Sequence, residues 1–407
     1  MRSNSLHKTW VDIDNGILRA NIRHLRKAIG DQREIIFVVK SDAYGHGAVN
    51  AAKVASAEGV KRFAVAGIHE GEELRAAGIT GEIILFHPPQ PFEVAACLDA
   101  GLSPAISALE NAQLISENAT GHTVGLHIEL NTGINRLGLE WQTAHQTIGE
   151  IAQLPNVQIN GLFTHFRATD PSDGRSIETQ LDRFRTVVRR VKEQGINPGL
   201  CHAASSHAIT RFADSHIEGV RPGMMMYIGA NGSPQDGLTQ PGIIAPIAEM
   251  KAVMSVRAHV LHVRRVEAGE WIHYGEMFKA KEPMIIAVIP IGYGMGYSRH
   301  FSNNADMLVR GKRAPVVGAV GMDMTMIDIT KIPEVKAGDI VTIMGTDGAE
   351  TVSGFELAQK AGTIVYEIVC RLGNALPRVI AESQTQRDSA ETSRSKAQAR
   401  TSSVSHA

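Results

Sequence analysis

The stretch IIFVVKSDAYGHGA, residues 35–48, decides the fold because a strongly apolar strand in it leads directly to a lysine. The five apolar residues at 35–39 are typical of a strand that is covered on both faces. Lys40 ends this strand, and a lysine there costs desolvation free energy unless its amine is paired or takes part in chemistry. The glycines that follow predict a tight turn before a helix that begins near Ala48. This layout suits a Schiff-base lysine, although a lone lysine at a strand end more often only extends to solvent.

Seven further strand-like runs follow, and amphipathic helical segments separate most of them. The runs are residues 62–67, 82–87, 103–107, 123–130, 158–165, 199–205 and 219–227. Eight strands with helices between them predict a (β/α)8 barrel. The alternative is a doubly wound parallel sheet, but no GxGxxG motif follows the first strand.

The pattern changes near residues 237–246, where turn residues gather and helical periodicity stops. Short alternating strands then run to about residue 382, with one late helix near residues 354–361. We predict a barrel domain over residues 1–240 and a mostly β domain over residues 241–382, with the early strand at 10–14 as a candidate to join the β domain. Residues 383–407 hold almost no large apolar side chain, which predicts a disordered tail.

Composition limits the partners and the compartment. The chain has 41 Lys and Arg against 42 Asp and Glu, so no net charge favours nucleic acid or an anionic membrane. The three cysteines form no CxxC motif, which argues against a disulfide framework or a zinc site and predicts a reducing compartment. No run reaches the ~18 apolar residues of a membrane helix, and the N-terminus lacks an apolar signal-peptide core. We therefore expect a cytoplasmic protein without a metal site, whose partners are small molecules or a second copy of itself.

The segment VVKSDAYGHGA resembles the lysine motif that binds pyridoxal 5'-phosphate (PLP) in the alanine racemase family. Further matches recur in family order over about residues 8–380, among them ELNTGINRLG, WIHYGEMF, GMDM and IVYEIVCRLG. The resemblance implies a PLP-dependent isomerase that interconverts L- and D-alanine and supplies D-alanine for peptidoglycan. It also implies a barrel followed by a β domain, and a head-to-tail homodimer with shared active sites.

The resemblance also implies the cofactor contacts. Lys40 would carry PLP, and Arg221 would face the pyridine nitrogen with His202 hydrogen-bonded behind it. The other implied contacts are His165, Ser205 and, around the phosphate, Tyr44, Ser206, Tyr366 and the backbone amides of Gly223 and Met224. A guanidinium keeps its proton, so the ring nitrogen would accept a hydrogen bond and stay unprotonated. We expect this to favour return of a proton to the substrate Cα over transamination, and Arg221→Glu to change the ratio of the two reactions.

Racemisation without turning the substrate over needs one base on each face of a planar centre. By the resemblance, these bases are Lys40 and Tyr274 from the β domain of a second subunit, with His165 as the partner of the phenol. Phenols titrate near pH ~10, so a phenol needs a cationic or hydrogen-bonding neighbour to act near neutrality. The substrate carboxylate would bind to Arg136, whose donors match both oxygens, and to the backbone amide of Met322 from the second subunit. Residues that match family positions around the entrance are Asp323, Tyr293 and Arg378.

Three positions depart from the family pattern. Glu129 precedes Arg136 where many members carry a lysine that is modified to a carbamate and holds the arginine. A glutamate already presents a carboxylate, so we predict an unmodified Glu129–Arg136 pair. Gly321 stands where cysteine, serine or threonine is usual, and Ala319 where arginine is common, which predicts a roomier substrate pocket. One methylene discriminates by only about 1 to 3 kcal/mol, so a broad-specificity racemase that accepts serine, lysine or others is an alternative.

Two further functions stay open. A PLP-dependent decarboxylase shares this architecture, but it places a carboxylate against the pyridine nitrogen, where this chain has Arg221. It also carries a cysteine-containing acidic motif in its C-terminal domain, which this chain lacks. A non-catalytic PLP carrier built on the barrel alone would not need a β domain with Tyr274 and Met322.

Overall fold

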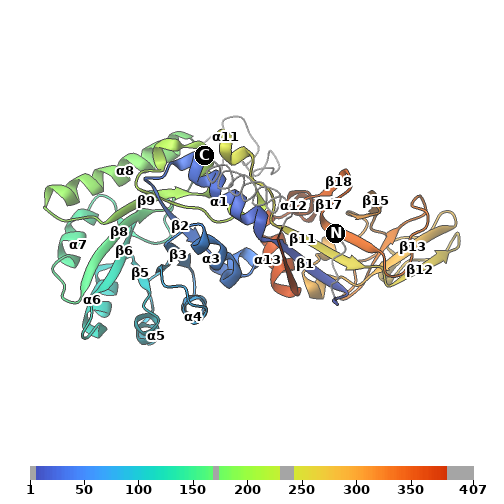
Figure 1. The fold of residues 1–407 in the computed structure, drawn as a ribbon, viewed down its shortest axis with the longest axis horizontal. Helices are drawn as coiled ribbons and strands as arrows, with labels where there is room; N and C mark the ends of the chain where they lie inside the picture. The colour runs from blue at the N-terminus through green and yellow to red at the C-terminus, as the bar shows by residue number, and fades with distance from the viewer. Residues whose placement is uncertain (1–5, 168–173, 230–242, 383–407) are drawn as a thin grey trace, which may run out of the picture.

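A closed barrel of parallel strands comes first in the chain, and a mostly β domain follows it along the long axis of the molecule (Figure 1). The structure, a computed structural model, describes residues 6–167, 174–229 and 243–382. The barrel strands are β2 (Glu34–Val38), β3 (Arg62–Val65), β4 (Glu82–Leu85), β5 (Ser103–Ile106), β6 (Val124–Asn131), β8 (Val157–Thr164), β9 (Leu200–Ser205) and β10 (Gly219–Arg221). They pair in the order β5-β4-β3-β2-β10-β9-β8-β6, and β6 also pairs with β5, which closes the sheet. The predicted (β/α)8 barrel is therefore confirmed, with the short β7 (Leu139–Glu140) added beside β6.

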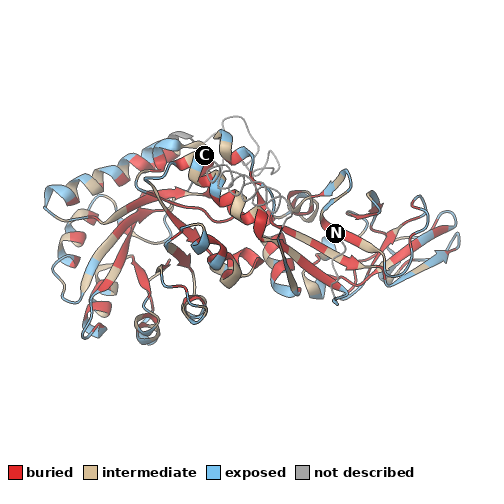
Figure 2. Ribbon diagram, viewed as in Figure 1, coloured by how far each residue is buried: buried red, intermediate tan, exposed pale blue. Residues whose placement is uncertain are grey.

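Helices cover the outside of the barrel. They are α1 (Asn15–Ile29), α3 (Ala48–Ala57), α4 (Ile68–Ala76), α5 (Val94–Asp99), α6 (Leu109–Asn118), α7 (Ala144–Ile151) and α8 (Gly174–Glu193). In α1, Leu18, Ile22, Leu25 and Ile29 recur every three or four residues and are all buried, so one face of the helix packs on the barrel. Figure 2 shows the same division in the barrel, with buried strands inside and exposed outer helix faces. Side chains at the C-terminal ends of the strands consequently meet at one mouth of the barrel.

The β domain contains two sheets. The larger joins β15 (Lys312–Pro315), β14 (Asp306–Val309), β17 (Ile340–Asp347), β11 (Met254–His259), β1 (Thr9–Asp14) and β19 (Arg378–Ala381), with β18 (Glu350–Val352) paired to β17. The smaller joins β12 (His262–Val266), β13 (Met284–Ile289) and β16 (Thr325–Asp328). β1 pairs antiparallel with β11 and parallel with β19, so the N-terminal strand lies in the sheet of the C-terminal domain. Trp10, Val11 and Ile13 are fully buried there, so the first and last strands that the structure describes lie in one sheet.

The expectation of one late helix was wrong, because two helices precede β19. They are α12 (Gly354–Ala361) and α13 (Val365–Ala375). In α13, Val365, Ile368, Val369 and Leu372 recur at helical spacing and are buried. In the sequence these residues are separated by Glu367 and Arg371, and the stretch is too short for this spacing to identify a helix by itself.

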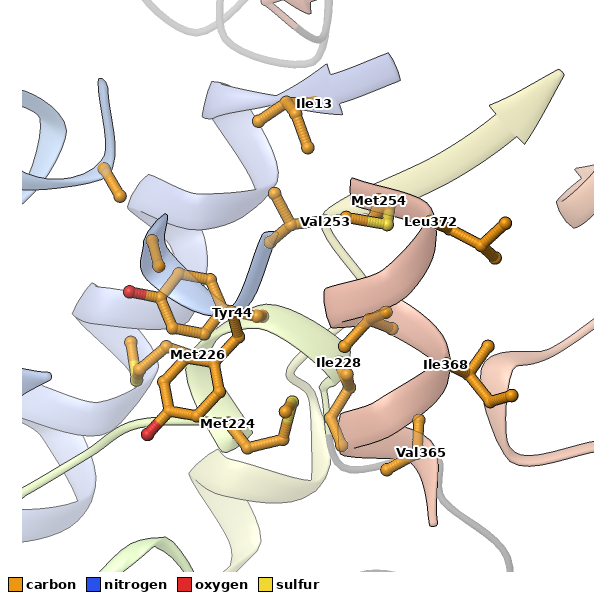
Figure 3. Packing of buried hydrophobic residues seen from close by; sticks show 14 of the residues in the cluster. Ile13, Tyr44, Met224, Met226, Ile228, Val253, Met254, Val365, Ile368 and Leu372 are labelled. Carbon is orange, nitrogen blue, oxygen red and sulfur yellow. The ribbon is translucent and has the colours of Figure 1, made fainter. Parts of the chain in front are cut away.

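One hydrophobic core runs from the barrel into the β domain. Met224, Met226 and Ile228 of the barrel belong to the same buried cluster as Ile368 and Leu372 of α13 (Figure 3). Tyr44, from the turn that follows Lys40, belongs to the same cluster. The turn that carries the lysine is therefore supported by both domains.

Candidate active site

Lys40 begins α2 (Lys40–Gly45), immediately after barrel strand β2. The next four residues, Ser41 to Tyr44, have φ between 52° and 55°, so this turn is left-handed. Each such residue costs roughly 1–2 kcal/mol relative to a right-handed conformation. A turn was predicted here, but its handedness was not, because none of these four residues is glycine. Neighbouring groups must therefore hold the turn in place.

Arg378 holds the left-handed turn from the side of the β domain, through Asp42 of the turn itself. Asp42 Oδ2 lies 2.5 Å from Arg378 Nη2, and Asp42 Oδ1 accepts a hydrogen bond from Ala48 N (2.6 Å). Arg378 Nε also donates to Gly45 O (2.9 Å). A Cβ on Gly45 would lie 2.7 Å from Val369 O, so α13 packs against the turn without space for a side chain. Arg378, which the resemblance implied near the entrance, thus braces the segment that carries Lys40.

Glu70 supports the turn from the side of the barrel, and sequence reasoning missed it because no motif marks it. Ser41 N donates a hydrogen bond to Glu70 Oε1 (2.5 Å). The Lys40 amine is half-buried, and burial lowers its pKa, with Arg136 lowering it further and Glu70 opposing the shift. A lower pKa leaves more of the amine neutral, which is the form that attacks an aldehyde.

The residues expected around a phosphate lie together beside this turn. Gly223 N donates to Ser206 Oγ (3.0 Å), where Ser206 begins α9 (Ser206–Arg211). A Cβ on Gly223 would lie 2.5 Å from Tyr44 Oη, so only glycine leaves room at this point. The rings of Tyr44 and Tyr366 are 6.1 Å apart, and the pKa of Tyr44 is raised by burial and then by Tyr366. Met224 follows Gly223, just before α10 (Met225–Ile228), and Ser205 ends β9 opposite Arg221.

Arg221 is almost completely buried and uses most of its donors within the protein. Its Nη1 donates to His202 Nδ1 and His202 O, both at 2.9 Å. Its Nη2 donates to Thr164 O (2.7 Å) and Ala203 O (2.9 Å). A guanidinium has four Nη hydrogens and one on Nε, so these bonds leave Nε–H as the donor for a ligand. Burial lowers the pKa of Arg221 to about 10, and the group keeps its proton at neutral pH with a smaller margin than a free arginine has.

His165, Arg136 and Glu129 lie around the same mouth and interact with Arg221 or Lys40 through charge. Burial lowers the pKa of His165 to about 3, and the cations Arg221, Arg136 and Lys40 add to the shift. A neutral His165 can offer a phenol a hydrogen bond but not a positive charge. Burial raises the pKa of Glu129, while Arg136 and Arg221 oppose the shift. The predicted contact pair is not formed in this chain: among the described residues no ion pair within 4 Å joins exposed Arg136 to buried Glu129.

We call the residues around Lys40 the barrel group. They are Lys40, Tyr44, Glu129, Arg136, His165, His202, Ser205, Ser206, Arg221, Gly223, Met224 and Tyr366. A second set, the β-domain group, comprises Tyr274, Tyr293, Met322 and Asp323. Tyr293 N donates to Gly321 O (3.0 Å), and Gly294 N donates to Met322 O (2.9 Å), so these loops are bonded to each other. Tyr274 is 73% exposed and Met322 62% exposed.

His273 lies beside the β-domain group. The sequence analysis did not identify it, although it directly precedes Tyr274. Its ring lies 4.4 Å from the Tyr274 ring, and its Nδ1 accepts a hydrogen bond from Tyr274 N (2.9 Å). A Cβ on Gly321 would come within 3.0 Å of His273 Cε1 and Nε2. The side chain missing at position 321 is therefore replaced by an imidazole, and Ala319 is completely buried. The roomier substrate pocket suggested at these two positions stays a prediction.

The two groups are not brought together within one chain. Tyr274 lies between β12 and β13, and these strands are at the far end of the molecule from the barrel (Figure 1). No described helix is long and apolar enough to cross a membrane. Within the described ranges, no cluster of three or more histidine, cysteine or acidic side chains could hold a metal ion.

Two family descriptions match successive parts of the chain. Residues 13–231 match the N-terminal domain of alanine racemase, and residues 253–380 match its C-terminal domain. The chain belongs to the alanine racemase family. The alanine racemase of Methanococcus maripaludis is 35% identical over 378 residues, which cover 92% of this chain and 98% of that protein. The alanine racemase of Clostridium tetani is 36% identical over 380 residues, covering 92% of this chain and 95% of the relative.

Solved structures of the family share the whole fold. The alanine racemase of Clostridium difficile 630 superposes with a TM-score of 0.86 at 30% identity, covering 93% of this chain and 97% of the other. The Bacillus anthracis alanine racemase, solved with bound L-Ala-P, gives a TM-score of 0.84 at 30% identity and covers 94% and 97%. The similarity therefore extends over both domains rather than over the barrel alone.

Proposed function

We propose that this chain interconverts L- and D-alanine with PLP bound at Lys40, and that it does so as a cytoplasmic homodimer whose product serves peptidoglycan synthesis. The observation that carries the proposal is the seat formed by Arg221 and Gly223. Arg221 keeps one N–H for a pyridine nitrogen, and Gly223 leaves space beside Tyr44 and Ser206 for a phosphate. Such a seat fits the polar ends of PLP, and Lys40 lies near it, since the charges of Lys40 and Arg221 both act on His165.

Bound PLP would withdraw electrons from the substrate Cα and so make its proton acidic. Lys40 would take or return that proton on one face, since burial and Arg136 favour its neutral amine. Arg136 is exposed at the mouth and would bind the substrate carboxylate there. Tyr274 would serve the opposite face, and neutral His165 would assist it as a hydrogen-bond partner.

The positions of the two groups support a head-to-tail dimer. Tyr274 and Met322 are mostly exposed in a single chain, where water would surround any phenol chemistry. Placing the β-domain group of one chain over the barrel mouth of another would bury both side chains and complete the site. Trp271, Met277 and Met324 are also partly exposed around Tyr274 and would supply apolar contact.

The test is a chiral assay of purified, PLP-loaded protein with L-alanine, in which released CO2 is measured in parallel. We expect D-alanine without CO2, and no turnover by Lys40→Ala. Release of CO2 would indicate a decarboxylase, and bound PLP without any turnover would indicate a carrier. Running serine and lysine beside alanine distinguishes a strict enzyme from a broad one. Because His273 fills the space at Gly321, we expect alanine to be preferred.

A further inference from the structure

A chain of hydrogen bonds crosses the barrel interior behind Arg221. Arg221 Nη1 lies 2.9 Å from His202 Nδ1, and His202 Nε2 lies 3.1 Å from His127 Nδ1. His127 Nε2 in turn lies 3.2 Å from Glu82 Oε1. Arg221 ends β10, whereas Glu82 begins β4. These hydrogen bonds therefore connect the mouth of the barrel that holds Lys40 to the opposite mouth.

The two imidazoles in this chain are held in fixed planes. His127 and His202 are both completely buried. The Phe163 ring stacks on His202 with a centroid distance of 5.1 Å and an angle of 5°. A Cβ on Gly161 would lie 2.6 Å from His127 Nδ1, so a glycine is needed for the strand to pass this ring. Neither ring can turn without displacing the barrel core.

Only one arrangement of protons satisfies every contact. A guanidinium only donates, so His202 Nδ1 accepts from Arg221 and His202 Nε2 carries the hydrogen. His127 Nδ1 then accepts from His202, which leaves a hydrogen on His127 Nε2 to donate to the Glu82 carboxylate. Burial keeps the pKa of His202 well below its usual value, consistent with the neutral ring that this arrangement requires.

Glu82 is held as a carboxylate at the far end. Its Oε1 also accepts from Asn160 Nδ2 (2.9 Å) and Ser103 Oγ (3.1 Å), and its Oε2 accepts from Arg62 Nε (3.0 Å). Burial alone would raise the pKa of Glu82, but His127, Asn160 and Arg62 outweigh burial and lower it to about 2. The hydrogen-bond chain therefore begins at the Arg221 cation and ends at a negatively charged carboxylate.

We propose that His127 and Glu82 are positioning residues for Arg221, because they fix His202 as an acceptor and so fix the guanidinium that would face the pyridine nitrogen. The inference rests on the proposed function, since Arg221 matters in this way only if a cofactor ring binds beside it. Neither residue lies at the mouth that holds Lys40. They would act on the site only through the hydrogen bonds described above.

Glu82→Gln is a sharp test because an amide cannot satisfy both ends of the network. If the amide oxygen faces His127, the NH2 group meets the donor Arg62 Nε. If the NH2 group faces His127, the donor directions reverse and a hydrogen on His202 Nδ1 opposes Arg221 Nη1. The variant should therefore populate both tautomers of His202, while the wild type holds one. Glu218→Gln is the matched control, since Glu218 lies just before β10 at the same mouth and its carboxylate accepts from Cys201 N (2.7 Å), outside the hydrogen-bond chain from Arg221 to Glu82.

The tautomers are measured by NMR of isotope-labelled histidine rings in the full-length protein, with and without PLP, using His202→Asn to assign the signals. We expect a single Nε2–H form of His202 in the wild type and in Glu218→Gln, and a mixture in Glu82→Gln. With PLP loaded, Glu82→Gln should lower kcat about 10-fold with little change in KM for alanine, as loss of a partner behind a functional group typically does.

An unchanged His202 tautomer in Glu82→Gln would overturn the inference, and so would kcat equal to that of Glu218→Gln. Should Glu82→Gln not fold, His127→Gln interrupts the chain at its middle and is measured in the same two ways. A wild type that binds no PLP would instead overturn the proposed function. The two failures are therefore distinguishable.

Discussion

The barrel group and the β-domain group differ in how firmly one chain holds them. Around Lys40, the turn is bonded to Arg378, Ala48 and Glu70, and Arg221 makes four hydrogen bonds in an almost completely buried setting. Around Tyr274, the loops are bonded to each other, but the phenol itself is 73% exposed. The cofactor side of the site is preorganised within one chain, whereas the second base depends on what covers it.

This difference predicts that the two groups fail in different ways. Damage to the cofactor contacts of the barrel group should remove cofactor binding, whereas damage to the β-domain group should leave the cofactor bound and remove only turnover. If a chain with a mutated Tyr274 still binds PLP in its barrel, a second chain with an intact Tyr274 can complement it.

Complementation gives the largest expected effect. Lys40→Ala and Tyr274→Phe should each lower racemisation by about 10²–10⁴-fold, because each removes one proton-transferring group. Mixing equal amounts under conditions that exchange subunits should restore about a quarter of wild-type activity, because half of the dimers are mixed and each mixed dimer has one intact site. The measurement is the chiral assay before and after mixing. A mixture that stays inactive, although subunit exchange is demonstrated, would show that both bases come from the same chain.

Gly223→Ala tests the preorganised side directly. The added Cβ would lie 2.5 Å from Tyr44 Oη, where the phosphate is proposed to bind. We expect the Kd for PLP to rise about 10-fold or more, a loss of at least ~1.4 kcal/mol of binding free energy. PLP affinity can be titrated by the absorbance of the bound cofactor. Gly149→Ala in α7 is the control, because its Cβ would meet only Gln194 Oε1 at 3.4 Å, and it should leave the Kd unchanged. Equal Kd values for the two variants would mean that Gly223 does not border the phosphate.

The barrel was predictable because strand-like runs such as residues 35–39 and 82–87 alternate with amphipathic segments. The turn after Lys40 was predictable only in outline. Its left-handed conformation depends on Arg378 and Glu70, which lie far away in the sequence and carry no local turn signal. The hydrogen bonds from His202 to Glu82 could not be predicted either, since His127 and Glu82 lie in strands that carry no motif.

The Glu129–Arg136 contact pair shows the limit of arguing from spacing. Glu129 lies within β6 and points into the barrel, where it is 2% exposed. Arg136 lies in the loop beyond the end of β6 and is exposed. Spacing along the chain identified two groups that influence each other electrostatically, but the distance between them depends on a loop whose shape the sequence does not specify.

On the β-domain side, a smaller effect is expected from the contact between His273 and Gly321. Gly321→Ala adds a Cβ within 3.0 Å of the His273 ring, and this should displace the neighbouring Tyr274 and lower kcat about fivefold. His273→Gly removes the ring and suits the φ of 62° at this position. Combining both changes should recover part of the loss, and the recovery is measured by a double-mutant cycle on kcat. If the two losses simply add, His273 does not position Tyr274.

The smallest effect is expected at Glu129, which acts on Arg136 through charge rather than contact. Glu129→Gln should raise KM for alanine roughly three- to tenfold, the scale of one charge-assisted interaction, and the exposed Glu140→Gln on the same segment should not. Because burial raises the pKa of Glu129, the wild-type carboxylate should become protonated as the pH falls through that raised value, and KM should rise there. Glu129→Gln has no such group to titrate, so its KM should lack this acid-side rise. Since the carboxylate is already present in the side chain, removing bicarbonate should leave the wild-type rate unchanged. A requirement for bicarbonate would mean that the negative charge near Arg136 does not come from Glu129.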